Sequence, residues 1–555
     1  MKTFFSCVLM CVALVACATP TQTSQSEKVT AATSTPHPTV VRQQTSAANA
    51  VRGGTLVMGR VTEAATLQPL LAADAASQAY IALLYAPLVR VDPHTLEITG
   101  VLYEDKPTVA ADGSKITWKL RAGLKWSDGK PLTPQDIIFT WQKMMDDKVN
   151  FRYRQTYRDA FVNVQAVDDL TVDYILRTPG FCPALAKTDL VPPIPKHVFE
   201  NLDINANDVN NKPTVTSGPF RFKEWTRDDH FTASPANENF VRGKPYLDAV
   251  TYRVVKDQVV AAQLFKTQEL DVAPTMTVAA GESIKDLPHT QFVAFYPTIG
   301  ASTSYLVMNL RNALLADKAA RQAIALAIDK QAIADTIIGG FGKRQSAIYP
   351  AAAWAAVDDK ELPRYDFAPA KANQLLDAAG YARGANGMRA AKDGKPLKLR
   401  IDYDAGNKVR EQMALVTQAY LKDVGIAVEV AAYEFNTFLD KARKGDVDLY
   451  FEARVSDYDP SDAKNWYATN GGQNLVGYSN PQVDQLFAQA ETVPGCRQAE
   501  RKAIYAQIQK SIAEDSPFVI LFTFQTINYY NKRVNLLPLT SFGVMYDIEK
   551  IWIKP

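Results

Sequence analysis

The segment TWKLRAGLKWSDGKPLT, residues 117–133, decides the fold of this chain of 555 residues. Around its start, Ile116, Trp118 and Leu120 alternate with polar residues. Alternation with a period of two is typical of a half-buried strand. The residues at 122–129 include two glycines and a Ser-Asp-Gly triplet, which favour turns because glycine tolerates positive φ and aspartate bonds its own backbone. The segment therefore predicts a strand followed by a turn.

A helix is predicted directly after this turn. Thr133 has the character of an N-cap, Pro134 occupies the first helical position, and Asp136 stands where a capping-box acid would bind the cap amide. The apolar residues that follow recur at helical spacing. The whole block is a strand-turn-helix unit, and we expect it to build scaffold without contacting a ligand.

Four further groups of segments stand out along the rest of the chain. They are residues 217–225 with 243–248, residues 268–272, residues 305–309 with 321–330, and residues 366–381. In this order, together with 117–133, they resemble the bacterial extracellular solute-binding proteins of ABC importers, in the large class that binds oligopeptides, dipeptides and nickel. One position departs from that pattern, since Gln268 stands in place of a glycine.

The resemblance implies an α/β, periplasmic-binding-protein-like (type II) two-lobed hinge fold with an additional lobe. Alternating strand-like and helix-like patterns independently indicate α/β layers. The implied map has lobe I at residues 52–97, 212–303 and 515–555, lobe II at 98–211, and lobe III at 304–514. The chain would cross between lobes I and III near residues 303 and 515. Paired crossings of this kind make a hinge that closes around a ligand.

The N-terminus predicts export and lipidation. Residues 1–16 have the basic start and short apolar run of a signal peptide, and Leu14-Val15-Ala16-Cys17 has the form of a lipobox. The alternative is an ordinary secretory peptide with an incidental cysteine. A diacylglycerol on Cys17 would anchor the protein in the cell envelope, on an extracytoplasmic face of a membrane. Residues 17–51 would then form a disordered tether, since they contain no aromatic residue and are rich in Thr, Ser, Ala, Gln and Pro.

Two of the five cysteines are left as possible thiols in the folded part, Cys182 and Cys496. Cys7 and Cys11 would leave with the signal peptide, and Cys17 would be lipidated. Because the map puts Cys182 in lobe II and Cys496 in lobe III, a bridge would oppose hinge motion. We therefore expect these two residues not to pair.

Composition and motifs narrow the function. The formal net charge of +2 does not predict the concentrated basic face that nucleic acid needs. The five histidines are scattered, and no zinc-protease helix, nucleophile elbow or phosphate-binding glycine loop occurs. We therefore predict no catalytic residue, no metal ligand and no cofactor, and we expect a monomer.

The best candidate for ligand contact is RVSDYDP, residues 454–460. It resembles the lobe III loop in which peptide-binding relatives carry Trp-x-x-Asp, whose aspartate pairs with the peptide's α-ammonium group. Asp457 falls on that position, and its alternative role is that of a turn aspartate. Arg454 replaces the tryptophan, and it would either neutralise Asp457 or meet an anionic group of a different ligand. Tyr458 and Trp466 complete the predicted site, with a core position as the alternative for Trp466.

Three functions follow as hypotheses. The first is a membrane-tethered receptor that captures a small solute, an oligopeptide or dipeptide, and delivers it to the permease subunits of an ABC importer. The second is a receptor that senses such a ligand without supporting uptake. The third is an envelope hydrolase.

Overall fold

The segment at residues 117–133 folds as predicted. Strand β5 (Lys115–Lys119) leads through turns with positive φ at Gly123 and Gly129 into helix α2 (Pro134–Met145). Thr133 and Asp136 form the predicted capping box at the start of α2. The side chain of Trp118 is fully buried. The block is thus interior scaffold.

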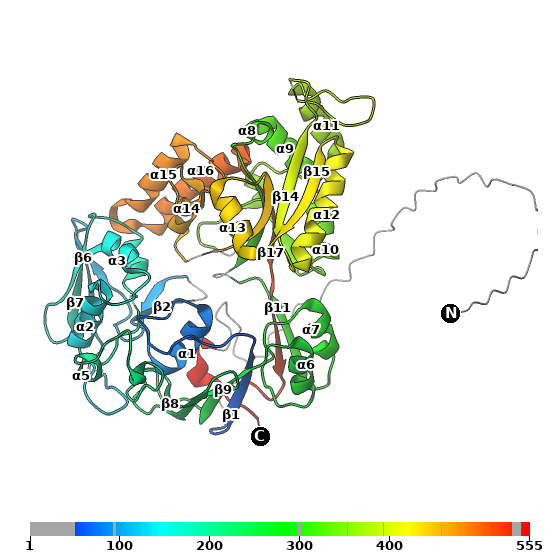
Figure 1. Cartoon of the computed structure of the whole chain (residues 1–555). Helices are drawn as coiled ribbons and strands as arrows, with labels where there is room; N and C mark the ends of the chain where they lie inside the picture. Colours follow the sequence, from blue (N-terminus) through cyan, green and yellow to red (C-terminus); the bar gives the residue numbers. More distant parts are fainter. Residues whose placement is uncertain are drawn as a thin grey trace, which may run out of the picture. The chain divides into compact units, whose positions relative to one another are not determined.

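The computed structural model describes residues 50–92, 96–189, 191–297, 301–351, 353–391, 393–456, 458–535 and 545–554. The predictions of a signal peptide at residues 1–16, of lipidation at Cys17 and of a tether as far as residue 49 lie outside the described residues, and so does Asp457. Three sheets organise the described part, and each is named below by one of its strands (Figure 1).

The β9 sheet has four strands in the order β1-β10-β9-β8, with β1 and β10 parallel and the other pairs antiparallel. Its elements are β1 (Thr55–Arg60), β8 (Phe220–Thr226), β9 (His230–Ala236) and β10 (Ala249–Val254), with helix α1 (Ala75–Leu84). A short hairpin of β2 (Val89–Val91) and β3 (Ile98–Gly100) follows α1.

The β5 sheet is antiparallel, in the order β4-β5-β7-β6. Its further elements are β4 (Thr108–Val109), β6 (Phe161–Ala166), β7 (Thr171–Leu176), α3 (Arg154–Ala160), α4 (Ala184–Lys187), α5 (Lys196–Phe199) and the 3-10 helix η2 (Asp208–Asn210). One hydrophobic core contains buried side chains of both this sheet and the β9 sheet, among them Trp118 and Phe231. The predicted lobes I and II therefore share a core.

The β12 sheet has six strands in the order β13-β17-β12-β16-β14-β15. The strands are β12 (Ser302–Met308), β13 (Gly342–Arg344), β14 (Lys398–Asp404), β15 (Ala427–Tyr433), β16 (Leu449–Val455) and β17 (Phe518–Phe524). The helices around it are α8 (Ala313–Ala316), α9 (Lys318–Ala327), α10 (Lys330–Thr336), α11 (Pro369–Ala378), α12 (Lys408–Asp423), α13 (Phe435–Lys444), α14 (Lys464–Tyr467), α15 (Pro481–Glu491) and α16 (Gln498–Asp515), with η3 (Asp359–Glu361), η4 (Pro460–Ala463) and η5 (Pro494–Cys496).

Both faces of the β12 sheet are buried. Successive side chains of a strand point to opposite faces, so neighbouring residues of β12 enter different cores. On β12, Leu306 and Met308 belong to one core, which includes residues of α9 and α12. Tyr305 and Val307 belong to a second core, which includes residues of α15 and α16. This is the layered α/β arrangement predicted from the sequence.

A two-stranded ribbon continues β12 and β17, two neighbouring strands of the β12 sheet. It consists of β11 (Thr290–Phe295) and β18 (Thr526–Asn531), with α6 (Gln258–Lys266) and α7 (Val278–Lys285) before it in the chain and η7 (Ile548–Lys550) near the C-terminus. Residues 296–301 join β11 to β12, and residue 525 joins β17 to β18. The two links are neighbours, because both β11–β18 and β12–β17 are antiparallel pairs. The boundary predicted at residue 515 falls at the end of α16, whereas β17 still pairs within the β12 sheet.

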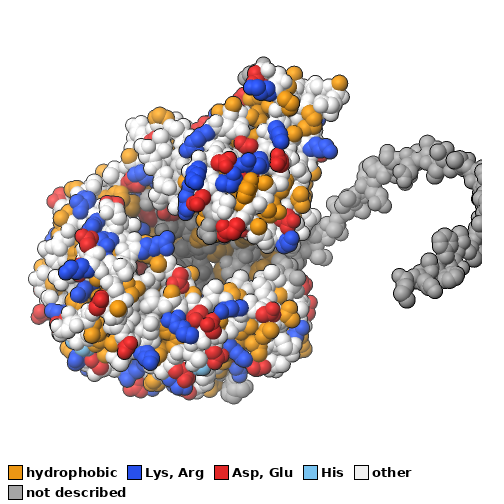
Figure 2. Space-filling view, viewed as in Figure 1, with side chains coloured by type: hydrophobic (Ala, Val, Ile, Leu, Met, Phe, Trp, Pro, Cys, Tyr) orange, Lys and Arg blue, Asp and Glu red, His pale blue; other side chains and the backbone are white. Residues whose placement is uncertain are grey.

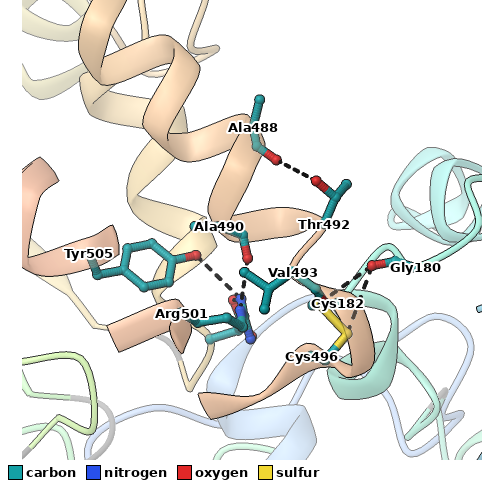
Figure 3. The surroundings of a disulfide bond; sticks show 10 residues. Gly180, Cys182, Ala488, Ala490, Thr492, Val493, Cys496, Arg501 and Tyr505 are labelled. Atoms are coloured by element: carbon teal, nitrogen blue, oxygen red, sulfur yellow. Dashed lines mark hydrogen bonds and ion pairs between the residues drawn. A yellow bond between two sulfur atoms is a disulfide. The ribbon is translucent and has the colours of Figure 1, made fainter. Parts of the chain in front are cut away.

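The expectation that Cys182 and Cys496 stay unpaired is wrong. The two residues form a disulfide, with Cα atoms 5.3 Å apart and a sequence separation of 314 (Figure 3). Cys182 lies between β7 and α4, and Cys496 lies in η5, the turn between α15 and α16. The expectation rested on the argument that a bridge between lobes would oppose hinge motion, but the two segments are in contact here, since the backbone amide of Cys182 also donates to the Glu491 carbonyl at 2.8 Å.

Candidate ligand site

Arg454 lies near the end of β16, which pairs with β12, and the other predicted ligand residues follow it in the chain. In β16, Arg454 pairs in register with Thr303 of β12. The chain then passes Ser456 and Tyr458 into η4 and α14, which carries Trp466. The structure thus brings Arg454 and Trp466 together, with the guanidinium carbon 5.5 Å from the Trp466 ring centroid.

Arg454 is enclosed by aromatic rings. Its guanidinium carbon lies 4.7 Å from the ring centroid of Tyr305, 5.2 Å from that of Tyr467 and 4.2 Å from that of Phe518. Its Nε donates a hydrogen bond to Glu452, and the side chain of Arg454 is only 8% exposed. Arg454 is thus held by cation–π contacts and by an acidic partner on the same face of its own strand.

One part of this guanidinium is left for another partner. Among the described residues, the buried Nη1 of Arg454 has no hydrogen-bond partner. A cavity of about 30 Å³ is lined by Arg454, Ser456, Asp459 and Trp466, with other residues of the same loop. A space of that size holds one water-sized group. It therefore accommodates a bound water, or a single donor or acceptor atom of a ligand.

A buried ion pair fixes the loop that follows Arg454. Arg501 of α16 donates to both carboxylate oxygens of Asp459, each at 2.8 Å. Burial alone would raise the pKa of Asp459, but the hydrogen bonds and charge of Arg501 lower it below its ordinary value. Asp459 is also the N-cap of η4, where it accepts from the Ser461 amide at 3.0 Å. The two hydrogen bonds from Arg501 orient the loop, and the guanidinium charge neutralises the Asp459 carboxylate.

Tyr458 connects the loop after β16 to another part of the molecule. Its side chain packs against the core shared by the β5 and β9 sheets, and burial raises its pKa to about 12. The Tyr458 carbonyl accepts a hydrogen bond from the Trp354 ring nitrogen at 3.2 Å. Tyr458 is thus a contact between the loop after β16 and the shared core.

A larger cavity of about 600 Å³ lies at the two links between the ribbon and the β12 sheet. Its lining includes Tyr296 and Pro297 of one link, Thr523 at the end of β17, Lys343 and Gln345 around β13, and Tyr349. Tyr349 also lines the small cavity beside Arg454, so the two spaces share a wall. The volume is within the usual range for sites of small-molecule ligands.

Sequence reasoning missed these lining residues, because segments far apart in the chain supply them: residues 296–297, residues within 343–359 and residue 523. One local signal was available. The glycines before β13 and the Tyr349-Pro350 pair after it mark the turns that place this short strand at the sheet edge. The partner of Arg454 also had a signal, since residues two apart in a strand share a face.

The surface charges, the possible metal ligands and the apolar character of the helices add three observations. Basic and acidic side chains are interspersed over the face shown in Figure 2, as expected for a net charge of +2. Within the described ranges, no group of three His, Cys, Asp or Glu residues is arranged to hold a metal ion, and no helix is long and apolar enough to cross a membrane.

Comparison with known proteins agrees with this architecture. Residues 97–475 match the family model described as bacterial extracellular solute-binding proteins, family 5 Middle. The oligopeptide-binding protein AppA of Bacillus subtilis is 28% identical over 529 residues, which are 92% of this chain and 93% of AppA. Protein XP55 of Streptomyces lividans is 30% identical over 479 residues, covering 84% of this chain and 83% of XP55.

A solved structure extends the likeness to three dimensions. The structure of AppA from Bacillus subtilis in complex with a nonapeptide superposes with a TM-score of 0.71 at 26% identity, covering 91% of this chain and all of that one. The fold is therefore that of the type II two-lobed periplasmic binding proteins. Within that class, the chain belongs to family 5 of the bacterial extracellular solute-binding proteins, whose members are binding proteins of ABC importers acting outside the cytoplasm.

Proposed function

We propose that this protein captures a solute in the cavity at the two links and delivers it to the permease of an ABC importer. The observation that carries the proposal is the position of the cavity, because it is lined by Tyr296 of one link and by Thr523, which lies in β17 two residues before the other link. A ligand held there contacts both bodies that the links join. Its binding energy can therefore drive their closure.

The ligand class that fits best is an oligopeptide or dipeptide. Strand β13 is the edge strand of the β12 sheet and lines the cavity through Lys343, so one side of its backbone is not paired within the sheet. An extended peptide binds such an edge by main-chain hydrogen bonds, which are largely indifferent to side chains. Asp457 is proposed for the α-ammonium group, and Arg454 Nη1 for a small acceptor on the ligand. Broad peptide specificity is the expected consequence.

Delivery requires the protein to stay near its permease. Lipidation of Cys17 would anchor it to a membrane on the extracytoplasmic side, with residues 18–51 as the tether. We propose a monomeric receptor with three lobes as mapped above, whose partners are the peptide and the permease subunits.

Native mass spectrometry of the protein purified from its own host tests the proposal. We expect co-purified peptides that dissociate unchanged and bind again when they are added back. Binding of no member of a dipeptide-to-nonapeptide library would contradict the peptide assignment. Chemical conversion of the bound peptide would favour a hydrolase, and peptide uptake unaffected by gene deletion would favour a sensor.

A further inference from the structure

The disulfide is a third covalent connection across the molecule. The β12 sheet and its helices are joined to the rest of the chain by two neighbouring links, residues 296–301 and residue 525. The bridge from Cys182 to Cys496 joins the end of the β5 sheet to the α15–α16 turn, and neither of these elements belongs to the link strands. Two neighbouring links define a hinge axis, whereas a third attachment outside them opposes rotation about it.

Non-covalent contacts reinforce the connection on the β5 side. The Cys182 amide donates to the carbonyl of Glu491, the last residue of α15. The carboxylate of Glu491 in turn pairs with Lys464 of α14 at 2.7 Å. The bridge is therefore attached to the short helix that also carries Trp466. Cys182 itself is buried, with 2% of its surface exposed.

A second set of contacts runs from the bridge to the candidate ligand loop. Arg501 lies in the first turn of α16, five residues after Cys496, and its Nε donates to the Ala490 carbonyl at 2.9 Å (Figure 3). The same guanidinium holds both oxygens of Asp459. One buried side chain thus ties the end of α15, the start of α16 and the loop after Arg454 into a single unit, and the disulfide fixes that unit to the β5 sheet.

We propose that the Cys182–Cys496 disulfide is a clasp that limits opening of the ligand cleft and slows exchange of the bound solute. Bridged cysteines keep their Cα atoms within about 7 Å, and here they are 5.3 Å apart. Opening about the two links is then restricted to motions that leave this distance nearly unchanged. If the disulfide were broken, the α15–α16 turn and the loop after Arg454 would be released together from the β5 sheet. This inference rests on the proposed function only in naming the solute.

The test uses the mature protein without added ligand. Oxidised wild type, the same protein reduced with tris(2-carboxyethyl)phosphine, and a Cys182→Ser/Cys496→Ser variant are compared by small-angle scattering and hydrogen exchange. Reduction is balanced, since the phosphine and one water become phosphine oxide and the disulfide becomes two thiols. We expect a larger radius of gyration and exchange on the order of tenfold faster at residues 454–467 and 491–497 in both bridge-free forms.

Two controls keep the outcome decisive. Single Cys182→Ser and Cys496→Ser variants should match the double variant, and reduction of the double variant should change nothing. If the double variant misfolds, the reduced wild type still provides the comparison. Equal scattering and equal exchange in oxidised and reduced wild type, or two titratable thiols in protein secreted into an oxidising compartment, would overturn the clasp. Because no peptide is involved, these results are independent of the failure or success of the peptide screen.

Discussion

Replacing Asp459 by Asn tests whether one buried ion pair holds the loop that carries the predicted ligand residues. The side chains of Asp459 and Arg501 are 11% and 7% exposed, and their two hydrogen bonds are both 2.8 Å long. Removing one partner of a buried pair costs about 3–5 kcal/mol, because the other charge is left uncompensated. Asparagine keeps the N-cap function, so the change isolates the charge.

The loss should be visible as a lower midpoint of thermal unfolding for the β12 sheet and its helices. For a region of about 200 residues, 1 kcal/mol corresponds to about 2–4 °C, so the midpoint should fall by roughly 6–20 °C. Scanning calorimetry measures this, with Glu500→Gln as the matched control. Glu500 pairs with Arg497 at the exposed start of the same helix, and its loss should change the midpoint little.

Two further measurements test whether the Asp459–Arg501 ion pair stabilises the fold. The Asp459→Asn/Arg501→Met variant should be more stable than Asp459→Asn alone, because it no longer buries an unpaired guanidinium. The folded-state pKa of Asp459 is lowered, so the pair stabilises above the unfolded pKa of about 4 and its contribution disappears as the pH falls through the folded value. A midpoint for Asp459→Asn equal to that of Glu500→Gln would refute the argument.

Three other predictions concern the anchor, the ligand and the pH dependence of stability. Cys17→Ala should leave the protein uncleaved or free in the envelope fraction, and detergent partitioning like that of wild type would contradict lipidation. Asp457→Ala should weaken an amine-bearing peptide by more than about 1 kcal/mol in calorimetric titration, whereas an N-acetylated peptide should bind both forms alike. Burial lowers the pKa of Lys330 to about 7, so stability should rise between pH 7 and 10 as the folded protein loses this charge before the unfolded chain does. Lys330→Met should remove that rise in thermal unfolding measured across this pH range.

The local elements could be predicted because their causes are local. The alternation around Trp118, the glycine turns and the capping box at Thr133 each involve residues a few positions apart, and the structure contains all of them as predicted. The α/β layering could also be predicted, because strand-like and helix-like patterns alternate along the chain. The family also follows from the order of such units along the chain, as the matching family model confirms.

The partners of the site residues could be predicted only in part. Glu452 lies on the same strand face as Arg454, and this relation follows from the strand period. The four rings around Arg454 come from β12, α14 and β17, and no short-range pattern in the sequence predicts that they meet. The packing of Tyr458 against the core shared by the β5 and β9 sheets likewise depends on the tertiary structure.

The sequence by itself determined the scaffold of this protein, because periodicity, capping and turn chemistry act over a few residues, and the resemblance of its ordered segments to a known family indicated a solute-binding protein. Only the tertiary structure decided that Cys182 meets Cys496 across 314 positions, that Arg501 holds Asp459, and that the cavity opens at the two links. These contacts depend on how whole sheets pack. Their free energy comes from burial and pairing between segments whose distance in space is set by the complete fold.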